Sequence, residues 1–134
     1  MSQITNMSIT RRGSVLGLFS TSHMDYETAR VEGPGGQPSL ATMTRAAVER
    51  LQGGTGFLLV VEAGRIDHGH HANNAKMAME ETLALEAAVN VVMELTSRED
   101  TLVMLTADHS HAVTMSGYQP RGNPILGTVL RPDR

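Results

Sequence analysis

Hydrophobic residues along this chain follow two patterns, continuous apolar runs and stretches in which apolar residues recur every three or four positions. Residues 57–61 (Phe-Leu-Leu-Val-Val) and 101–106 (Thr-Leu-Val-Met-Leu-Thr) do not alternate between apolar and polar positions. Such runs are typical of strands buried on both faces of a parallel sheet. Residues 15–19 form a shorter apolar run, and residues 112–115 are a candidate for a further short strand. The runs therefore predict at least three buried strands.

Between these runs, apolar residues recur at the spacing of a helix. Pro38 and Ser39 favour the start of a helix, and Gly53 and Gly54 favour its end. The apolar residues that share one face of this helix are Leu40, Met43, Ala47 and Leu51. A second, longer helix is predicted from about residue 71 to residue 96, with an apolar face formed by Leu85, Ala88, Val89 and Val92. Its solvated face is predicted to carry Glu81, Glu86 and Glu94.

The predicted order is strand, helix, strand, helix, strand. This order predicts an α/β fold with a parallel sheet and right-handed crossovers. Sheets of this kind bind ligands at the carboxyl ends of their strands. Glu62 and Asp108 each lie at or just beyond such an end, so both are expected at one edge of the sheet.

Two clusters of carboxylate and imidazole side chains follow the predicted strands. Residues 62–71 read Glu-Ala-Gly-Arg-Ile-Asp-His-Gly-His-His, and residues 106–111 read Thr-Ala-Asp-His-Ser-His. Carboxylate oxygens and imidazole nitrogens at this density are what a divalent metal site requires. Two such clusters indicate more than one metal ion, and hence hydrolysis of phosphate esters or a similar reaction.

The spacing within the clusters assigns candidate ligands. Asp67 and His71 are four residues apart, so in a helix both point the same way and can hold one zinc ion. Glu62 offers a carboxylate suited to magnesium, and Asp108 and His109 offer ligands for a second zinc ion. The roles of three further histidines stay open between orienting the ligands, contacting an anion and a purely structural role; they are His68, His70 and His111.

Composition narrows the classes of function. The chain has 134 residues, the size of one domain, with a net charge of −3 and no cysteine. Without a basic stripe or an aromatic stacking surface, no nucleic-acid partner is expected. The first 12 residues have no apolar core of a secretory signal, and no apolar run is long enough to span a membrane.

The residues of the two clusters resemble the metal-binding segments of the alkaline phosphatases. The resemblance extends to the intervening residues, including Glu81-Thr82-Leu83, and to Leu16-Gly17-Leu18-Phe19 with His23-Met24 upstream. It implies a magnesium ligand at Glu62, one zinc ion at Asp67 and His71, and another zinc ion at Asp108 and His109. It also implies hydrolysis of phosphate monoesters, in which the family uses a serine nucleophile. The implied fold is a partial parallel-sheet sandwich of the alkaline phosphatase kind.

The chain departs from the family pattern at several points. It contains no Asp-Ser-Ala motif, which carries the family's nucleophile, and no histidine after His111. Ser20 and Gln37 stand where acidic calcium ligands would be expected, so no calcium site is predicted. The resemblance covers residues 15–127, which are predicted to be a partial catalytic domain, with a polar lead at residues 1–14 and a tail that does not resemble the family at residues 128–134. No catalytic residue is assigned within them.

Three hypotheses follow. The leading one is a zinc- and magnesium-dependent alkaline phosphatase, of which this chain carries part of the metal site and is inactive alone. The alternative is a non-catalytic, metal-binding remnant of the family, and the third is a different α/β metallohydrolase. The resemblance also implies a homodimer for the full-length family and an extracellular, membrane-anchored or periplasmic location.

Overall fold

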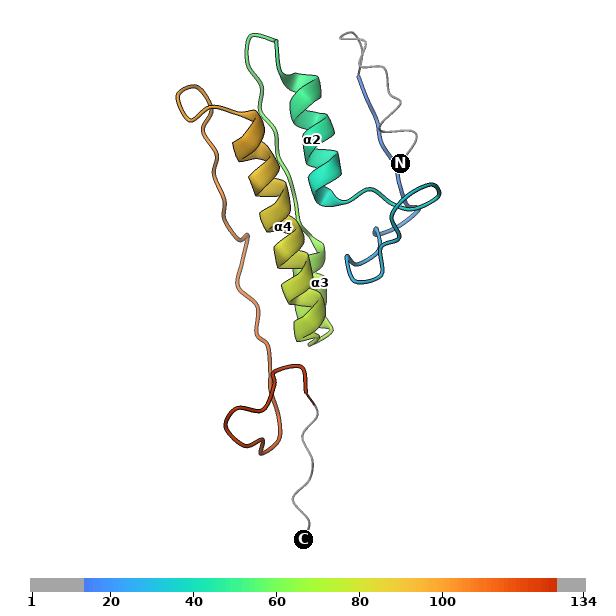
Figure 1. Ribbon diagram of the computed structural model, residues 1–134, viewed down its shortest axis with the longest axis vertical. Helices are drawn as coiled ribbons and strands as arrows, with labels where there is room; N and C mark the ends of the chain where they lie inside the picture. Colours follow the sequence, from blue (N-terminus) through green and yellow to red (C-terminus); the bar gives the residue numbers. More distant parts are fainter. Residues whose placement is uncertain (1–13, 128–134) are drawn as a thin grey trace.

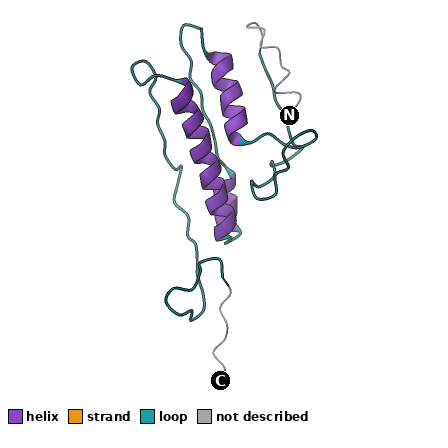
Figure 2. Cartoon of the chain, viewed as in Figure 1, coloured by secondary structure: helices purple, strands orange, loops and turns teal. Residues whose placement is uncertain are grey.

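The computed structural model describes residues 14–127, and within that range it contains three helices: α2 (Leu40–Leu51), α3 (Arg65–His71) and α4 (Ala75–Leu95). Helices α2 and α4 lie side by side and run in the same direction, while the short α3 packs against the beginning of α4 (Figure 1). The remaining described residues are loops and extended segments (Figure 2). The predicted tail, and the predicted lead apart from Ser14, lie outside the described residues.

Helix α2 begins and ends where the sequence predicts. The Ser39 hydroxyl accepts a hydrogen bond from the backbone N–H of Thr42 at 3.1 Å, which satisfies a donor that the first helical turn leaves free. The helix ends before Gln52, and Gly53 then takes a φ of 82°, a conformation open to glycine. The predicted start and end signals of this helix are therefore confirmed.

The second predicted helix corresponds to α4, which begins later than predicted. Helix α3 ends at His71, Asn73 takes the left-handed conformation with a φ of 48°, and α4 begins at Ala75. The N–H groups of Asn73 and Asn74 donate to the carbonyls of His70 and Gly69, at 2.8 and 3.0 Å. This is the pattern of a Schellman motif, which ends a helix. The prediction of one helix from about residue 71 was wrong at its start, because it took this break for helix.

The pairing of α2 with α4 provides much of the small buried core. On α2, Thr44 and Val48 are one turn apart and are 2% and 0% exposed, and on α4 Ala88 is 2% exposed. At the rim, Arg45 pairs with Glu94 at 2.6 Å. The small Ala88 permits close approach of the two helices, so burial rather than the exposed ion pair holds this pair together.

The predicted parallel sheet is absent from residues 14–127, which contain no strand. The four predicted strand segments (residues 15–19, 57–61, 101–106 and 112–115) are not joined in a ladder of backbone hydrogen bonds. Their apolar side chains are largely exposed; Leu58 is 88% and Leu102 is 83% exposed. A continuous apolar run indicates that burial would be favourable, but it does not supply the neighbouring strand that a sheet requires. The α/β fold class predicted from the sequence is therefore wrong for the described chain.

Glu81 attaches the loop before α2 to helix α4. Glu81 is 8% exposed, and its Oε1 accepts a hydrogen bond from the backbone N–H of Glu27 at 2.6 Å. In the same loop, Arg30 donates to Glu27 and Glu32 at 2.6 and 3.1 Å. The prediction that Glu81 lies on a solvated face was wrong, because its carboxylate has a backbone partner. Glu86 is exposed, as predicted.

Replacing Glu81 with alanine is expected to lower the free energy of unfolding by about 1–3 kcal/mol, the usual cost of leaving a buried hydrogen-bonding group without its partner. Thermal unfolding followed by circular dichroism at the helix band measures the change. Glu86→Ala is the matched control, because it makes the same substitution at an exposed position of the same helix. Equal stability of the two variants would contradict a role for Glu81 in holding the loop.

Candidate metal centre

Helix α3 places the first two candidate ligands on one face. Asp67 lies in its first turn and His71 at its end, and His71 Nε2 is 3.3 Å from Asp67 Oδ2. This is the geometry expected for side chains four residues apart in a helix. Their common face is confirmed, and their role as metal ligands stays a prediction.

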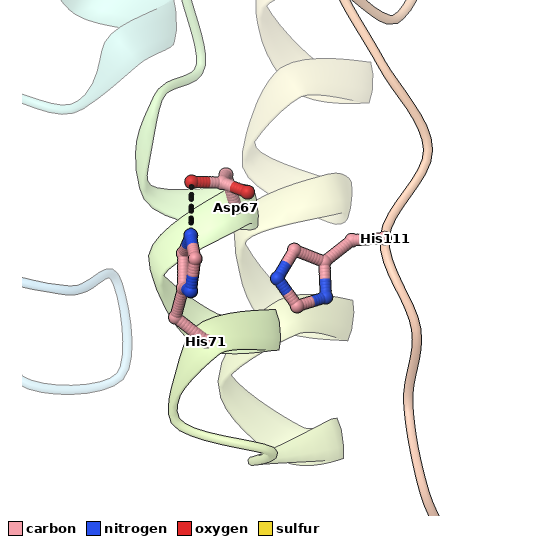
Figure 3. Close-up of side chains that lie close together, drawn as sticks. All are labelled: Asp67, His71 and His111. Carbon is pink, nitrogen blue, oxygen red and sulfur yellow. Dashed lines mark ion pairs between the residues drawn. The ribbon is translucent and has the colours of Figure 1, made fainter.

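A third side chain reaches this face from a different part of the chain. His111 belongs to the extended segment after residue 101, and Figure 3 shows its ring pointing toward Asp67 and His71. One ligand atom from each of the three residues lies within 4.8 Å of the others. The His111 ring also packs edge-on against His71 at 4.6 Å and stacks on His70 at 5.5 Å between ring centres.

Sequence reasoning left the role of His111 open. The available signal was its spacing from His109, because residues two apart in an extended segment point to the same side. The structure therefore adds His111 to the residues around Asp67. His111, Asp67 and His71 form a group of three side chains, within residues 14–127, that can hold a metal ion.

Asp67 gives an independent indication that a cation fits here. Its Oδ1 is buried and has no hydrogen-bond partner, and His109 Nε2 lies 3.8 Å away, beyond hydrogen-bond distance. A buried carboxylate oxygen is normally hydrogen-bonded or paired, because burial otherwise costs free energy. A divalent metal fits this position. One carboxylate oxygen with two imidazole nitrogens is a donor set that zinc accepts.

Of the other predicted ligands, His109 and Asp108 lie beside this group. His109 Nε2 is 3.5 Å from Asp108 Oδ2, and the Asp108 side chain is 85% exposed. His109 thus lies between Asp108 and Asp67. Glu62 is exposed and is not part of the three-residue group. Ligand roles for Glu62, Asp108 and His109 remain predictions.

The surroundings of His109 favour its protonated form. Its Nδ1 lies 3.0 Å from the backbone carbonyl of Ser110, and this contact, followed by the charges of Asp108 and Asp67, raises the pKa of His109 above its usual value. Only the neutral imidazole can bind a metal. A proton therefore competes with a metal ion at His109 to a higher pH than at an ordinary histidine.

The far side of α3 is fixed by a cationic side chain. Arg65 lies 3.7 Å from the ring centre of Tyr26, and its Nη1 is 3.0 Å from His68 Nδ1. The His68 ring also meets His23 edge-on at 4.6 Å. A guanidinium against an aromatic face is attractive. His68, left open by the sequence, therefore takes part in contacts that orient α3.

The chain is similar in sequence to known proteins. The family model described as alkaline phosphatase matches residues 2–133. The tissue-nonspecific alkaline phosphatase of Gallus gallus is 46% identical over 126 residues, which is 93% of this chain and 24% of the relative. Alkaline phosphatase 4 of Drosophila melanogaster is 42% identical over 129 residues, 94% of this chain and 21% of that relative. No solved structure gives a significant match.

The chain therefore belongs to the alkaline phosphatase family. It spans between a fifth and a quarter of the length of these two relatives. A third relative, 43% identical over 86% of this chain and 21% of its own length, is named as a membrane-bound alkaline phosphatase of Bombyx mori. Among the described residues, no helix is long and apolar enough to cross a membrane.

Proposed function

We propose that this protein hydrolyses phosphate monoesters with the help of two zinc ions and one magnesium ion. The observation that carries the proposal is the convergence of Asp67, His71 and His111 from two separate segments, with one Asp67 oxygen left unpartnered. Membership of the alkaline phosphatase family supplies the class of reaction.

The proposed ligand sets follow the sequence prediction. Asp67 and His71 hold one zinc ion, with His111 as a further donor beside them. Asp108 and His109 hold the second, and Glu62 binds magnesium. When bound, such ions stabilise the charge on attacking and leaving oxygens and generate a nucleophile at moderate pH.

The protein's own residues orient these donors. Helix α3 fixes the spacing of Asp67 and His71. Arg65 holds that helix against Tyr26. The Ser110 carbonyl fixes the ring of His109 through Nδ1, leaving Nε2 directed toward Asp67. Such outer contacts set the orientation and basicity of metal ligands.

A second candidate function is metal binding without catalysis. It requires no more than the donors that Asp67, His71 and His111 bring together. Both candidates require the metal centre, and they differ in whether a phosphate ester is turned over.

A chimera tests both candidates. In it, this chain replaces the matching segment of the Gallus gallus relative, so that the relative supplies the rest of the protein. We expect hydrolysis of an aryl phosphate that is lost on dialysis against a chelator and restored by zinc with magnesium. The unaltered relative, dialysed and reloaded in the same way, is the control.

The outcomes separate the candidates. Metal-dependent turnover supports the phosphatase. A folded chimera that binds zinc but releases no phosphate supports metal binding without catalysis. A folded chimera that binds no zinc overturns both.

Our proposals for the protein's oligomeric state and location rest on family membership alone. We propose that the full-length protein is a homodimer and that it acts outside the cytoplasm, in line with the membrane-bound relative from Bombyx mori. Size-exclusion chromatography with light scattering checks the first proposal, and fractionation of the source cells checks the second.

A further inference from the structure

Asn73 connects the two segments that carry the candidate ligands. It lies between α3 and α4, two residues after His71, and its side chain pairs with the backbone of Thr114, 41 residues further along the chain. Its Nδ2 donates to the Thr114 carbonyl at 3.0 Å, and its Oδ1 accepts from the Thr114 N–H at 2.9 Å. The primary amide thus satisfies both backbone groups of one residue, as a neighbouring strand would.

The segment that contains His109 and His111 has little else to fix its position. Residues 105–119 are exposed, so the burial of apolar side chains does not position them. The hydrogen bonds of Thr106, His109 and His111 each go to the carbonyl of the very next residue. Among the described residues, the long-range hydrogen bonds recorded for this segment are therefore those to Asn73.

The position of this pairing matters for the metal centre. Thr114 is three residues beyond His111, and Asn73 is two residues beyond His71. Pairing Thr114 with Asn73 therefore brings the His111 ring against His71 and leaves His109 3.8 Å from Asp67. Because Asn73 is close in sequence to His71 and Thr114 is close in sequence to His111, this pairing leaves the two groups of ligands little freedom to separate.

We propose that Asn73 is a positioning residue of the metal centre. Its side chain holds residues 108–114 against α3, and so assembles His109 and His111 with Asp67 and His71. The inference rests on the proposed metal-binding function and deepens it, because it assigns the residue that brings the ligand segments together.

The backbone at Asn73 suggests a simpler alternative. Among non-glycine residues of the described chain, Asn73 is the one with a positive φ, and it ends α3 in a Schellman motif. Glycine fills that position at least as well as asparagine. If ending the helix were its whole role, Asn73→Gly would leave the metal centre unchanged.

The substitution Asn73→Gly therefore separates the two roles, because it preserves the turn and removes the side-chain pairing. The dissociation constant of Zn²⁺ is measured on the full 134-residue chain by competition with a chromophoric chelator. We expect Asn73→Gly to weaken zinc binding by about 10- to 100-fold, the usual effect of losing a partner that orients metal ligands. The circular dichroism of the helices, measured on the same metal-free samples, is expected to stay unchanged.

Two substitutions at the other end of the pairing complete the test. Thr114→Ala is the matched control, because it keeps the backbone N–H and carbonyl that Asn73 contacts, and its zinc affinity is expected to equal that of the wild type. Thr114→Pro removes the N–H that donates to Asn73 Oδ1, and it does so without changing a residue of the α3–α4 turn, because Thr114 is 41 residues further along the chain. We expect it to weaken zinc binding in the same direction as Asn73→Gly, so the test holds even if the glycine variant loses its helices.

The outcomes distinguish the inference from the function on which it rests. Weaker binding in Asn73→Gly and Thr114→Pro, with Thr114→Ala unchanged, supports the inference. Wild-type affinity in a folded Asn73→Gly variant, or in Thr114→Pro, overturns it and leaves the metal centre standing. A wild-type chain that binds no zinc overturns the metal centre and the inference together.

Discussion

The substitution Gly69→Ala is expected to destabilise the packing of α3 on α4 by about 2 kcal/mol. A Cβ at Gly69 would lie 2.8 Å from the backbone nitrogen of Ala78 and 3.0 Å from its Cα. Both are backbone atoms of α4, which cannot rotate away as a side chain would. Overpacking of this kind costs about 1–3 kcal/mol, with larger values where the backbone must move.

A competing effect works in the opposite direction. Alanine is favoured over glycine within a helix by about 1 kcal/mol. The steric cost is expected to exceed this gain, because moving α3 outward also strains the bond from the Asn74 N–H to the Gly69 carbonyl, which is 3.0 Å long. That bond is part of the turn between the two helices, so the clash and the turn are coupled.

Urea unfolding followed at the helix band measures the change. Gly54→Ala is the control, because a Cβ there meets only the Leu51 carbonyl oxygen at 3.8 Å, an ordinary contact. We expect Gly54→Ala to keep the wild-type midpoint and Gly69→Ala to lower it. A Gly69→Ala chain at least as stable as the wild type would mean that α3 does not pack on α4 as closely as described.

Local signals in the sequence predicted part of the fold. Ser39 and Gly53 mark the two ends of α2 because capping and positive φ are properties of a few residues acting alone. The break between α3 and α4 was missed. Asn73 and Asn74 act there through a Schellman motif and an N-cap, and asparagine gives a weaker signal of helix termination than glycine does.

The sheet could not be predicted in the same way. Apolar runs such as residues 57–61 predict burial, yet burial depends on which surfaces the rest of the protein brings to them. Within residues 14–127, Leu58 and Val60 are 88% and 81% exposed. The pattern of the sequence thus describes a preference of the segment, while strand formation is a property of at least two segments.

In the candidate site, too, local features could be predicted from the sequence and long-range contacts could not. The pairing of Asp67 with His71 follows from helical spacing and was predicted from the residues alone. The approach of His111 depends on a contact between residues 73 and 114, and no local pattern indicates it. The family resemblance was confirmed by the comparisons, because it rests on residue identities and not on the fold.

Replacing Asp67 with asparagine is expected to weaken zinc binding by at least about 100-fold. The variant keeps the shape of the side chain and one oxygen, but it removes the negative charge from the middle of the group formed with His71 and His111. Loss of a direct ligand charge should exceed the roughly 10- to 100-fold effect of losing a partner outside the ligand shell. Competition with a chromophoric chelator measures the affinity, and Asp100→Asn, an exposed aspartate beyond the end of α4, is the control.

The same substitution is expected to have little effect on stability when metal is absent. Asp67 Oδ1 is buried without a hydrogen-bond partner, so neutralising the carboxylate removes a cost of burial. That gain opposes two losses, the attraction between Asp67 and His71 and a favourable negative charge in the first turn of α3. Unfolding in the presence of a chelator should therefore be nearly the same for wild type and Asp67→Asn.

Adding zinc should then separate the two proteins. Zinc that binds only the folded state raises the unfolding midpoint in proportion to the logarithm of its concentration over its dissociation constant. The wild type should be stabilised and Asp67→Asn should not. A residue kept for packing would show the reverse, with lower stability in chelator and an unchanged response to zinc. The change in stability in chelator and the response to zinc together decide whether Asp67 serves to bind the metal or to stabilise the fold.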